Sequence, residues 1–241
     1  TNDDNLQLLY SNFVLKRTKL QVGISLPPVQ SSRKTIEWKN DDERGFSLDI
    51  HNALQSASKK LQLILHARQT CILPSLVQKY IQKLVGDNSI PHKYSDIQIS
   101  SSSKMDAVID TIISRIHNGN GKIVFCHYRQ EIDTVVSRLA DAGIHNVCAF
   151  DGRLSQIKRI NLIQIPFQVI VLQIATGCEG LNLQQHFNEV FFVSPHWNPA
   201  IEDQAVARCH RIGQTKPVHV FRYQMQHFET PTIPVHSIEQ H

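Results

Sequence analysis

A chain of 241 residues, of which 41% are hydrophobic, can bury a core as one large α/β domain or as two small ones. The formal net charge of +4 permits an acidic partner such as nucleic acid without demanding one. Five cysteines with no C-x-x-C pair argue against a disulfide framework and against a zinc site, and no apolar run approaches the roughly 18 residues of a membrane-spanning helix. We therefore expect a soluble, unsecreted protein with no metal site and no membrane partner.

The first third of the chain predicts mainly helices. Residues 6–20 carry apolar residues at helical spacing, and Leu26-Pro27-Pro28 ends that helix because proline cannot continue one. A short strand is predicted over residues 33–38, and apolar residues recur near helical spacing over residues 46–65. We expect residues 1–85 to form a helical protrusion segment that leads into the main lobe.

A polar stretch separates this segment from the rest of the chain. Residues 86–103 read GDNSIPHKYSDIQISSSS, a composition typical of a surface linker. The clearest helix of the chain comes next, over residues 104–117, with Ser103 placed to cap it and Asn118 to Gly121 ending it. Its apolar stripe consists of Met105, Val108, Ile109, Ile112, Ile113 and Ile116.

From residue 122 onward, strands alternate with helices. Strands are predicted at 122–126, 147–150, 168–173, 189–193 and 218–222, and helices at 131–143, at 155–164 and before the last strand. This alternation predicts a doubly wound parallel sheet flanked by helices over residues 104–225, with ligands at the carboxyl ends of the strands. Residues 226–241 form a polar tail with two prolines.

Two segments between Gln173 and Gln214 have the pattern of a phosphate-facing site. Gly177 and Gly180 let the backbone pass close to a ligand, and Arg208 and Arg211 lie three apart, so on a helix they share one face. Taken alone, each signal is weak. A bare G-x-x-G is usually an ordinary strand-to-helix turn, and two such arginines usually face solvent.

The wider pattern is more specific. GCEGLNL, from Gly177, and HWNPAIEDQAVARCHRIGQTKPVHVFR, from His196, resemble motifs V and VI of the Swi/Snf family of DNA translocases in helicase superfamily two. The resemblance implies a second RecA-like lobe whose Arg208 and Arg211 are catalytic arginine fingers. His210 would lie on the same helix and orient them. The ATP-contacting residues that the resemblance implies are Gly177, Glu179, Gly180 and Gln204.

The resemblance also implies a track for double-stranded DNA. FCHYRQ at 125–130 follows a strand and resembles motif IV, and Asp151-Gly152-Arg153 matches a short turn of the family. Trp197, in the family's tryptophan-asparagine-proline signature, would protrude to rest against DNA. The structural alternatives are a polar loop without a partner and an ordinary core tryptophan. The candidate DNA-binding residues are His127, Tyr128, Arg129, Arg153, Thr176, Asn182 and Trp197.

No nucleotide cradle is found in the sequence. Gly119 to Lys122 imitates the end of a P-loop but has Ile123 where Ser or Thr must hold Mg²⁺, and Asp42 to Gly45 lacks the strand of a Walker B motif. ATP and Mg²⁺ would therefore be bound mainly by a first RecA-like lobe, and we expect the chain alone to be inactive. The expected partners are that lobe, double-stranded DNA, and nucleosomes or other DNA-bound proteins, in the nucleus.

The sequence departs from the family in two places. Before the motif V glycines, Gln173, Ile174 and Ala175 stand where the family has Ser or Thr and then a basic residue, which puts one DNA-phosphate contact in doubt. ARQTCILPSLV at 67–77 resembles the subgroup of the helicase-like transcription factor, but residues 80–103 contain no cysteine for its RING module.

The last residues and the wider function stay open. SIEQ near the end resembles the start of the family's brace segment, so we expect the chain to be a piece of a longer protein. Two alternatives to the translocase remain. One is a non-catalytic RecA-like module that binds DNA or protein, and the other is a helicase that separates strands.

Overall fold

The computed structural model describes residues 8, 23, 25–56, 60–152, 165–175 and 181–228. Apart from Leu8, the helix predicted over 6–20 lies outside the described residues. So do the helix predicted over 155–164 and the tail from residue 229 onward. Among the described residues, no helix is long and apolar enough to cross a membrane.

One sheet of six parallel strands forms the centre of the molecule, in the order β1-β6-β5-β2-β4-β3. The strands are β1 (Val29–Ile36), β2 (Gly121–Cys126), β3 (Val147–Phe150), β4 (Val169–Gln173), β5 (Phe187–Phe192) and β6 (Val218–Met225). β2, β4 and β5 are apolar and buried almost throughout, as expected of parallel strands covered on both faces. The predicted doubly wound parallel sheet is confirmed.

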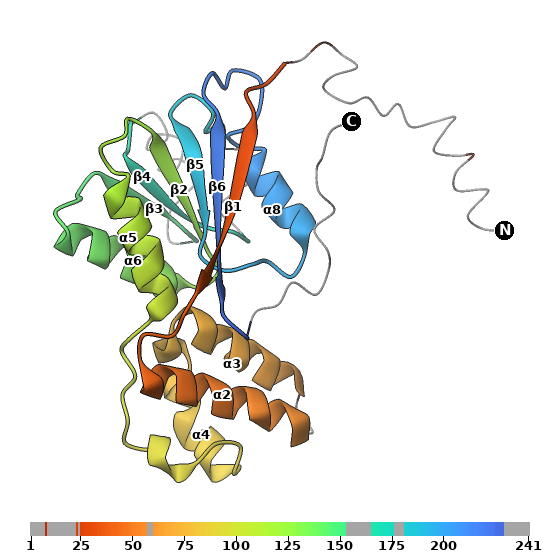
Figure 1. The fold of residues 1–241 in the computed structure, drawn as a ribbon, viewed down its shortest axis with the longest axis vertical. Coiled ribbons are helices and arrows are strands. Elements are labelled where there is room, and N and C mark those ends of the chain that lie inside the picture. Colours follow the sequence, from red (N-terminus) through yellow and green to blue (C-terminus); the bar gives the residue numbers. More distant parts are fainter. Residues whose placement is uncertain are drawn as a thin grey trace.

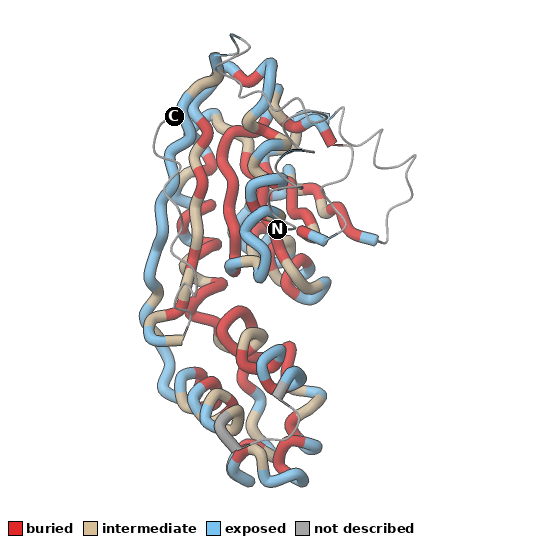
Figure 2. Tube along the Cα trace, turned by 90° about the vertical axis from the view of Figure 1, so that its right-hand side faces the viewer, coloured by how far each residue is buried: buried red, intermediate tan, exposed pale blue. Residues whose placement is uncertain are grey.

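Helices cover the two faces of this sheet (Figure 1). α5 (Ser103–Ser114) and α6 (Arg129–Asp141) lie on one face, and α8 (Pro199–Val206) lies on the other. Because side chains alternate along a strand, Val124 and Cys126 pack on the α5 and α6 side, whereas Ile123 and Phe125 pack on the α8 side. The edge strand β1 is exposed along nearly its whole length (Figure 2).

A helical part, residues 41–99, lies at the carboxyl ends of the strands (Figure 1). It contains α2 (Asp41–Ser56), α3 (Lys60–Ile72) and α4 (Ile81–Gly86), with the short 3-10 helices η2 (Pro74–Leu76), η3 (Gln78–Tyr80) and η4 (His92–Tyr94). Its own core includes Phe46, Ile50, Ala67, Ile81 and Tyr94.

The helical part is inserted between β1 and α5, in the predicted order of a short strand followed by helices. β1 falls inside the segment 1–85 that the sequence predicts as mainly helical, yet it pairs with β6 in the sheet. The periodic region 46–65 belongs to two helices and not to one. Pairing of β1 with a strand far along the chain leaves no signal in local periodicity.

Residues 86–103 are not a solvated linker. Ile90, Tyr94 and Ile99 are buried in the core of the helical part, and the Tyr94 hydroxyl donates to Asp49 at 2.7 Å. These three apolar side chains, four or five residues apart in a polar stretch, hold the segment against α2. The polar composition of this segment therefore predicted a surface position, but it did not indicate that its three apolar side chains are buried.

The start of α5 also differs by one residue from the prediction. Ser102 caps the helix, because its Oγ accepts from the Met105 amide at 3.1 Å. Ser103, the predicted cap, donates its hydroxyl to the buried Glu43 carboxylate at 2.7 Å. Burial raises the pKa of Glu43 above its usual value. Ile113, predicted in the buried stripe, is 37% exposed.

A buried ion pair joins β2 and β5 near their amino ends. Lys122 Nζ lies 3.6 Å from Glu189 Oε2, and Arg115, Asn118 and Asn120 all donate to Glu189 Oε1. Burial alone would raise the pKa of Glu189, but these hydrogen bonds outweigh it and hold the pKa below the usual value. Lys122, the lysine of the sequence that imitates a P-loop, is therefore paired with Glu189 inside the protein.

Candidate functional site

The loop between β2 and α6 carries His127 and Tyr128, two candidates for nucleic-acid contact. Glu131, which is fully buried in the first turn of α6, accepts from the amides of His127 at 2.8 Å and Tyr128 at 3.1 Å. A glutamate that reaches back to the start of its own helix fixes the direction in which the loop enters it. Burial raises the pKa of Glu131 to about 7. Arg129 begins the helix and is exposed.

Arg68, from α3 of the helical part, connects this loop with the loop after β5. Its Nη2 lies 2.8 Å from His127 Nε2 and also donates to the Pro195 carbonyl, while its guanidinium lies 4.9 Å from the centre of the Trp197 ring. Burial, together with the nearby Arg68 charge, lowers the pKa of His127 to about 3. His127 is therefore neutral at physiological pH and can accept from Arg68.

Trp197 is 60% exposed, and the two residues after it explain why. The Asn198 side chain accepts from the Ala200 amide at 3.0 Å and caps α8, and Pro199 takes the first helical position. Asparagine and proline thus start the helix and leave the tryptophan outside it. Glu202 accepts from the His196 amide at 2.8 Å and stabilises the same loop.

Lys104 of α5 completes the carboxyl-edge cluster, the name we give to Arg68, Lys104, His127, Glu131, Ser194 and Trp197. Its buried Nζ donates to Ser194 Oγ at 3.1 Å. The cluster joins α3, α5 and α6 to the ends of β2 and β5. Sequence reasoning missed Arg68 and Lys104. The ARQTCILPSLV phrase drew attention to the region of Arg68 but gave that residue no role.

Arg208 and Arg211 do not lie on a helix, contrary to the prediction. α8 ends at Val206, and both arginines lie in what we call the arginine turn, residues 207–214. The buried Gln214 side chain shapes this turn, because its Nε2 donates to the carbonyls of Phe187 at 3.0 Å and Cys209 at 3.1 Å. Gly213 permits the reversal with φ of +98°.

His210 does not share a helix with the arginines either. It also follows the end of α8, and its Nε2 lies 2.8 Å from the Pro27 carbonyl oxygen. The contact joins the arginine turn to the segment just before β1. His210 therefore has a partner that sequence reasoning did not foresee.

The two arginines present hydrogen-bond donors at the surface. Arg211 is exposed and donates to the side-chain oxygen of Asn182. Arg208 is partly exposed, and its Nε is shielded from solvent without a hydrogen-bond partner among the described residues. Gln204, the ATP candidate on α8, is exposed.

The arginine turn does not lie at the carboxyl ends of the strands. The Arg208 carbonyl accepts from the Leu183 amide at 3.1 Å, and Gln214 bonds Phe187, the first residue of β5. Of the candidate residues, His127 and Trp197 therefore lie in loops at the carboxyl edge of the sheet, whereas the two arginines do not. Asn182, predicted to bind DNA, lies beside Arg211 and accepts a hydrogen bond from it.

Five of the candidate residues lie outside the described residues. They are Arg153, Thr176, Gly177, Glu179 and Gly180. Their roles remain predictions, and the described part of motif V consists of Leu181, Asn182 and Leu183.

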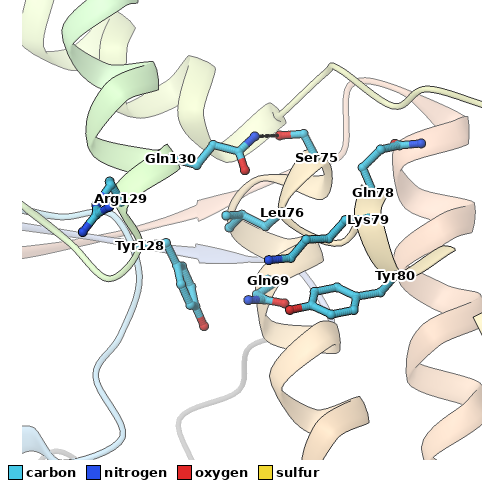
Figure 3. A pocket seen from close by; sticks show the side chains of 9 residues that line it. All are labelled: Gln69, Ser75, Leu76, Gln78, Lys79, Tyr80, Tyr128, Arg129 and Gln130. Carbon is cyan, nitrogen blue, oxygen red and sulfur yellow. Dashed lines mark hydrogen bonds between the residues drawn. The ribbon is translucent and has the colours of Figure 1, made fainter. Parts of the chain in front are cut away.

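A groove of about 480 Å³ lies between the helical part and the start of α6 (Figure 3). Tyr128 and Arg129 line it from the sheet side, and Lys79 and Tyr80 line it from the helical part. Gln130 Nε2 donates to Ser75 Oγ at 2.8 Å and bridges the two sides. None of the nine described residues that line the groove is acidic.

Comparison with known proteins finds a family model and relatives that are similar to part of the chain. Residues 103–213 match the helicase conserved C-terminal domain. ATP-dependent DNA helicase DDM1 of Arabidopsis thaliana is 28% identical over an alignment of 229 residues, gaps included, that covers 87% of this chain and 29% of that protein. The human SWI/SNF-related matrix-associated actin-dependent regulator of chromatin subfamily A member 1 is 25% identical over an alignment of 234 residues, gaps included, that covers 91% of this chain and 22% of that protein.

A solved structure agrees on the fold. The C-terminal part of the Fun30 ATPase domain superposes with a TM-score of 0.66 at 19% identity, covering 85% of this chain and 87% of that one. The first curated relatives are longer than this chain, which spans 29%, 21% and 47% of three of them. The chain thus corresponds to one part of these larger proteins.

Proposed function

We propose that the chain is the second RecA-like lobe of an ATP-dependent double-stranded DNA translocase, of the chromatin-remodelling or DNA-repair type. The match of residues 103–213 to the helicase conserved C-terminal domain and the similarity to DDM1 and to the human SWI/SNF-related regulator support this proposal. One observation carries the proposal. The lobe presents a turn with two arginines, separate from an aromatic and basic edge at the carboxyl ends of its strands.

The arginine turn fits a polyphosphate that is held by another lobe. Arg211 is exposed, and Arg208 keeps one shielded Nε without a partner among the described residues, so both have donors to spare. Gln204, together with Gly177, Glu179 and Gly180 of motif V, would contact the same nucleotide. ATP would transfer its γ-phosphoryl group to water, and Mg²⁺ would be held mainly by the first lobe. Arginines brought up when two lobes close stabilise the charge that develops in that transfer.

The carboxyl-edge cluster, together with the neighbouring Tyr128 and Arg129, fits the second part of the proposal, which is contact with DNA. Tyr128, Arg129 and Trp197 offer aromatic and cationic groups at one edge, with Arg153 and Thr176 as further candidates. Contacts of this kind hold a phosphate backbone without reading sequence. Since His127 is neutral, it would contact DNA through a hydrogen bond and not through charge. A translocase needs this sequence-independent grip.

The test compares the complete protein with this chain alone. We expect the complete protein to hydrolyse ATP when double-stranded DNA is added and to release no strand in a displacement assay. The 241-residue chain should bind DNA and hydrolyse almost no ATP. Turnover by the chain alone would contradict the division between two lobes. DNA binding without turnover by the complete protein would support the non-catalytic module instead.

A further inference from the structure

We propose that the groove between the helical part and the start of α6 binds the sugar-phosphate backbone of double-stranded DNA. The DNA track would then extend from the sheet onto the helical part. This inference rests on the proposed function, since it assigns to the same duplex a contact surface outside the motifs of the sheet lobe.

The chemistry of the groove fits a phosphodiester backbone. Its nine lining residues include two cations, Lys79 and Arg129, and no carboxylate. Gln69, Gln78, Gln130 and Ser75 add uncharged polar groups, some of which are already bonded within the chain, as Gln130 is to Ser75 and Gln78 is to the Ile97 carbonyl. Most protein contacts to DNA go to phosphate and sugar oxygens and come from side chains of these types.

Lys79 is the cation that the helical part contributes. Its side chain is exposed and extends into the groove from η3, with Nζ 4.9 Å from the centre of the Tyr80 ring (Figure 3). Lys93 makes the same contact with Tyr94, at 4.8 Å, but its Nζ lies 3.5 Å from the Asp49 carboxylate. Lys93 is not among the residues that line the groove. The two lysines thus differ in their surroundings, because Lys93 is paired with a carboxylate whereas Lys79 faces a groove that contains none.

The groove is continuous with the loop already proposed to contact DNA. Tyr128 and Arg129 line it and directly follow His127, whose position Glu131 and Arg68 fix. The bond from Gln130 to Ser75 holds the helical part and α6 together across the groove. A strand that contacts the His127 loop and runs toward the helical part would therefore meet Lys79.

The salt dependence of DNA binding tests this directly. The chain is titrated into a fluorescent blunt-ended duplex at several salt concentrations, as wild type, Lys79→Gln and Lys93→Gln. Loss of one phosphate contact lowers the slope of log K against log salt by about 0.9. We expect that decrease, with a roughly threefold to tenfold weaker affinity at low salt, for Lys79→Gln. Lys93→Gln should match the wild type, and Lys79→Arg should retain the slope.

The outcomes separate the two proposals. If the wild type binds and Lys79→Gln has the same slope and affinity, the groove proposal is overturned and the proposed function stands. If neither the chain nor the complete protein binds the duplex, both are overturned. Equal losses for Lys79→Gln and Lys93→Gln would indicate a general effect of charge and would also overturn the groove. In the complete protein, Lys79→Gln should raise the DNA concentration at half-maximal ATPase and leave kcat unchanged.

Discussion

The carboxyl-edge cluster and the arginine turn are both polar, but they differ in how far the chain itself satisfies them. In the cluster, His127 has Arg68 as a partner, Lys104 has Ser194, and Glu131 accepts two amides. In the arginine turn, Arg211 is exposed and Arg208 keeps an Nε without a partner among the described residues. The first site is assembled within this chain, whereas the second offers donors that a partner would use.

α8 connects the two regions. It begins beside Trp197, where Asn198 caps it, and ends one residue before the arginine turn. Eight helical residues span about 12 Å, so α8 sets the separation between the Trp197 loop and the arginine turn.

The largest expected effect comes from removing the exposed hydrogen-bond donor of the arginine turn, Arg211. Replacing Arg211 with Ala in the complete protein should lower DNA-stimulated ATPase turnover by about a thousandfold or more, the range associated with arginine fingers. DNA affinity should be unchanged, because Arg211 lies away from the carboxyl-edge cluster. Steady-state ATPase assays and DNA titrations measure the two quantities.

Arg44→Ala serves as the matched control for that variant. Arg44 is another exposed arginine, on α2, and its loss should leave turnover within twofold of the wild type. If Arg211→Ala retained full turnover, Arg211 would not be a finger. The arginine turn could then no longer be described as a site that offers its hydrogen-bond donors to a partner.

The next effect tests the cluster through the pH dependence of stability. Glu131 has a pKa of about 7 in the folded chain against an ordinary 4.5, so the folded state binds more protons between these values. The wild type therefore loses stability as pH rises through this window, by about 3 kcal/mol. Glu131→Gln cannot titrate. Its free energy of unfolding relative to the wild type should rise by that amount from pH 4.5 to above 7.

Denaturant unfolding of both proteins at several pH values measures this difference. A pH-independent difference for Glu131→Gln would mean that the folded chain does not raise this pKa. The cluster would then be less buried than its geometry indicates.

The sequence predicted the sheet well and the arginine turn poorly, for a physical reason. β2, β3, β4 and β5 are mostly apolar and mostly buried, so their positions can be predicted from local composition. The residues after Val206 include good helix formers, and local propensity extended α8 through them. α8 ends at Val206, and the turn that follows it is held by Gln214, which bonds Phe187 27 residues earlier in the chain. A contact at that distance has no local signal.

Arg68 was missed for the same reason. It lies 59 residues from His127 and 127 residues from Pro195, so only the fold reveals that one guanidinium joins two loops. Motif reasoning found His127 and Trp197 because each belongs to a recognisable phrase. It could not find the residue that holds them together.

Replacing Arg68 with Met should weaken DNA binding by about tenfold, since a cation over an aromatic ring and its hydrogen bonds contribute about 1 to 2 kcal/mol. The packing of the side-chain stem is kept, so the loss reflects the position of the two loops. With Trp38 replaced by Phe, Trp197 is the remaining tryptophan of the chain, and its fluorescence should shift as the ring becomes freer. Arg68→Lys, which keeps the charge without the planar fork, should recover only part of the affinity.

An unchanged Trp197 signal together with weaker binding would show that Arg68 contacts DNA itself. Unchanged binding in Arg68→Met would show that the two loops hold their positions without it. Either result would alter the description of the cluster as a site assembled by this guanidinium.

The smallest effect decides which of the two regions Asn182 serves. The sequence assigned it to the DNA track, but its side chain accepts from Arg211 in the arginine turn. If it orients the finger, Asn182→Ala in the complete protein should lower kcat about fivefold, the value of one hydrogen bond of about 1 kcal/mol, and leave DNA affinity unchanged. If it belongs to the track, DNA affinity should fall with kcat unchanged. Gln185→Ala, an exposed amide nearby in sequence, controls for general effects of removing an amide. Because the two outcomes move different constants, this variant separates the regions more sharply than the larger effects do.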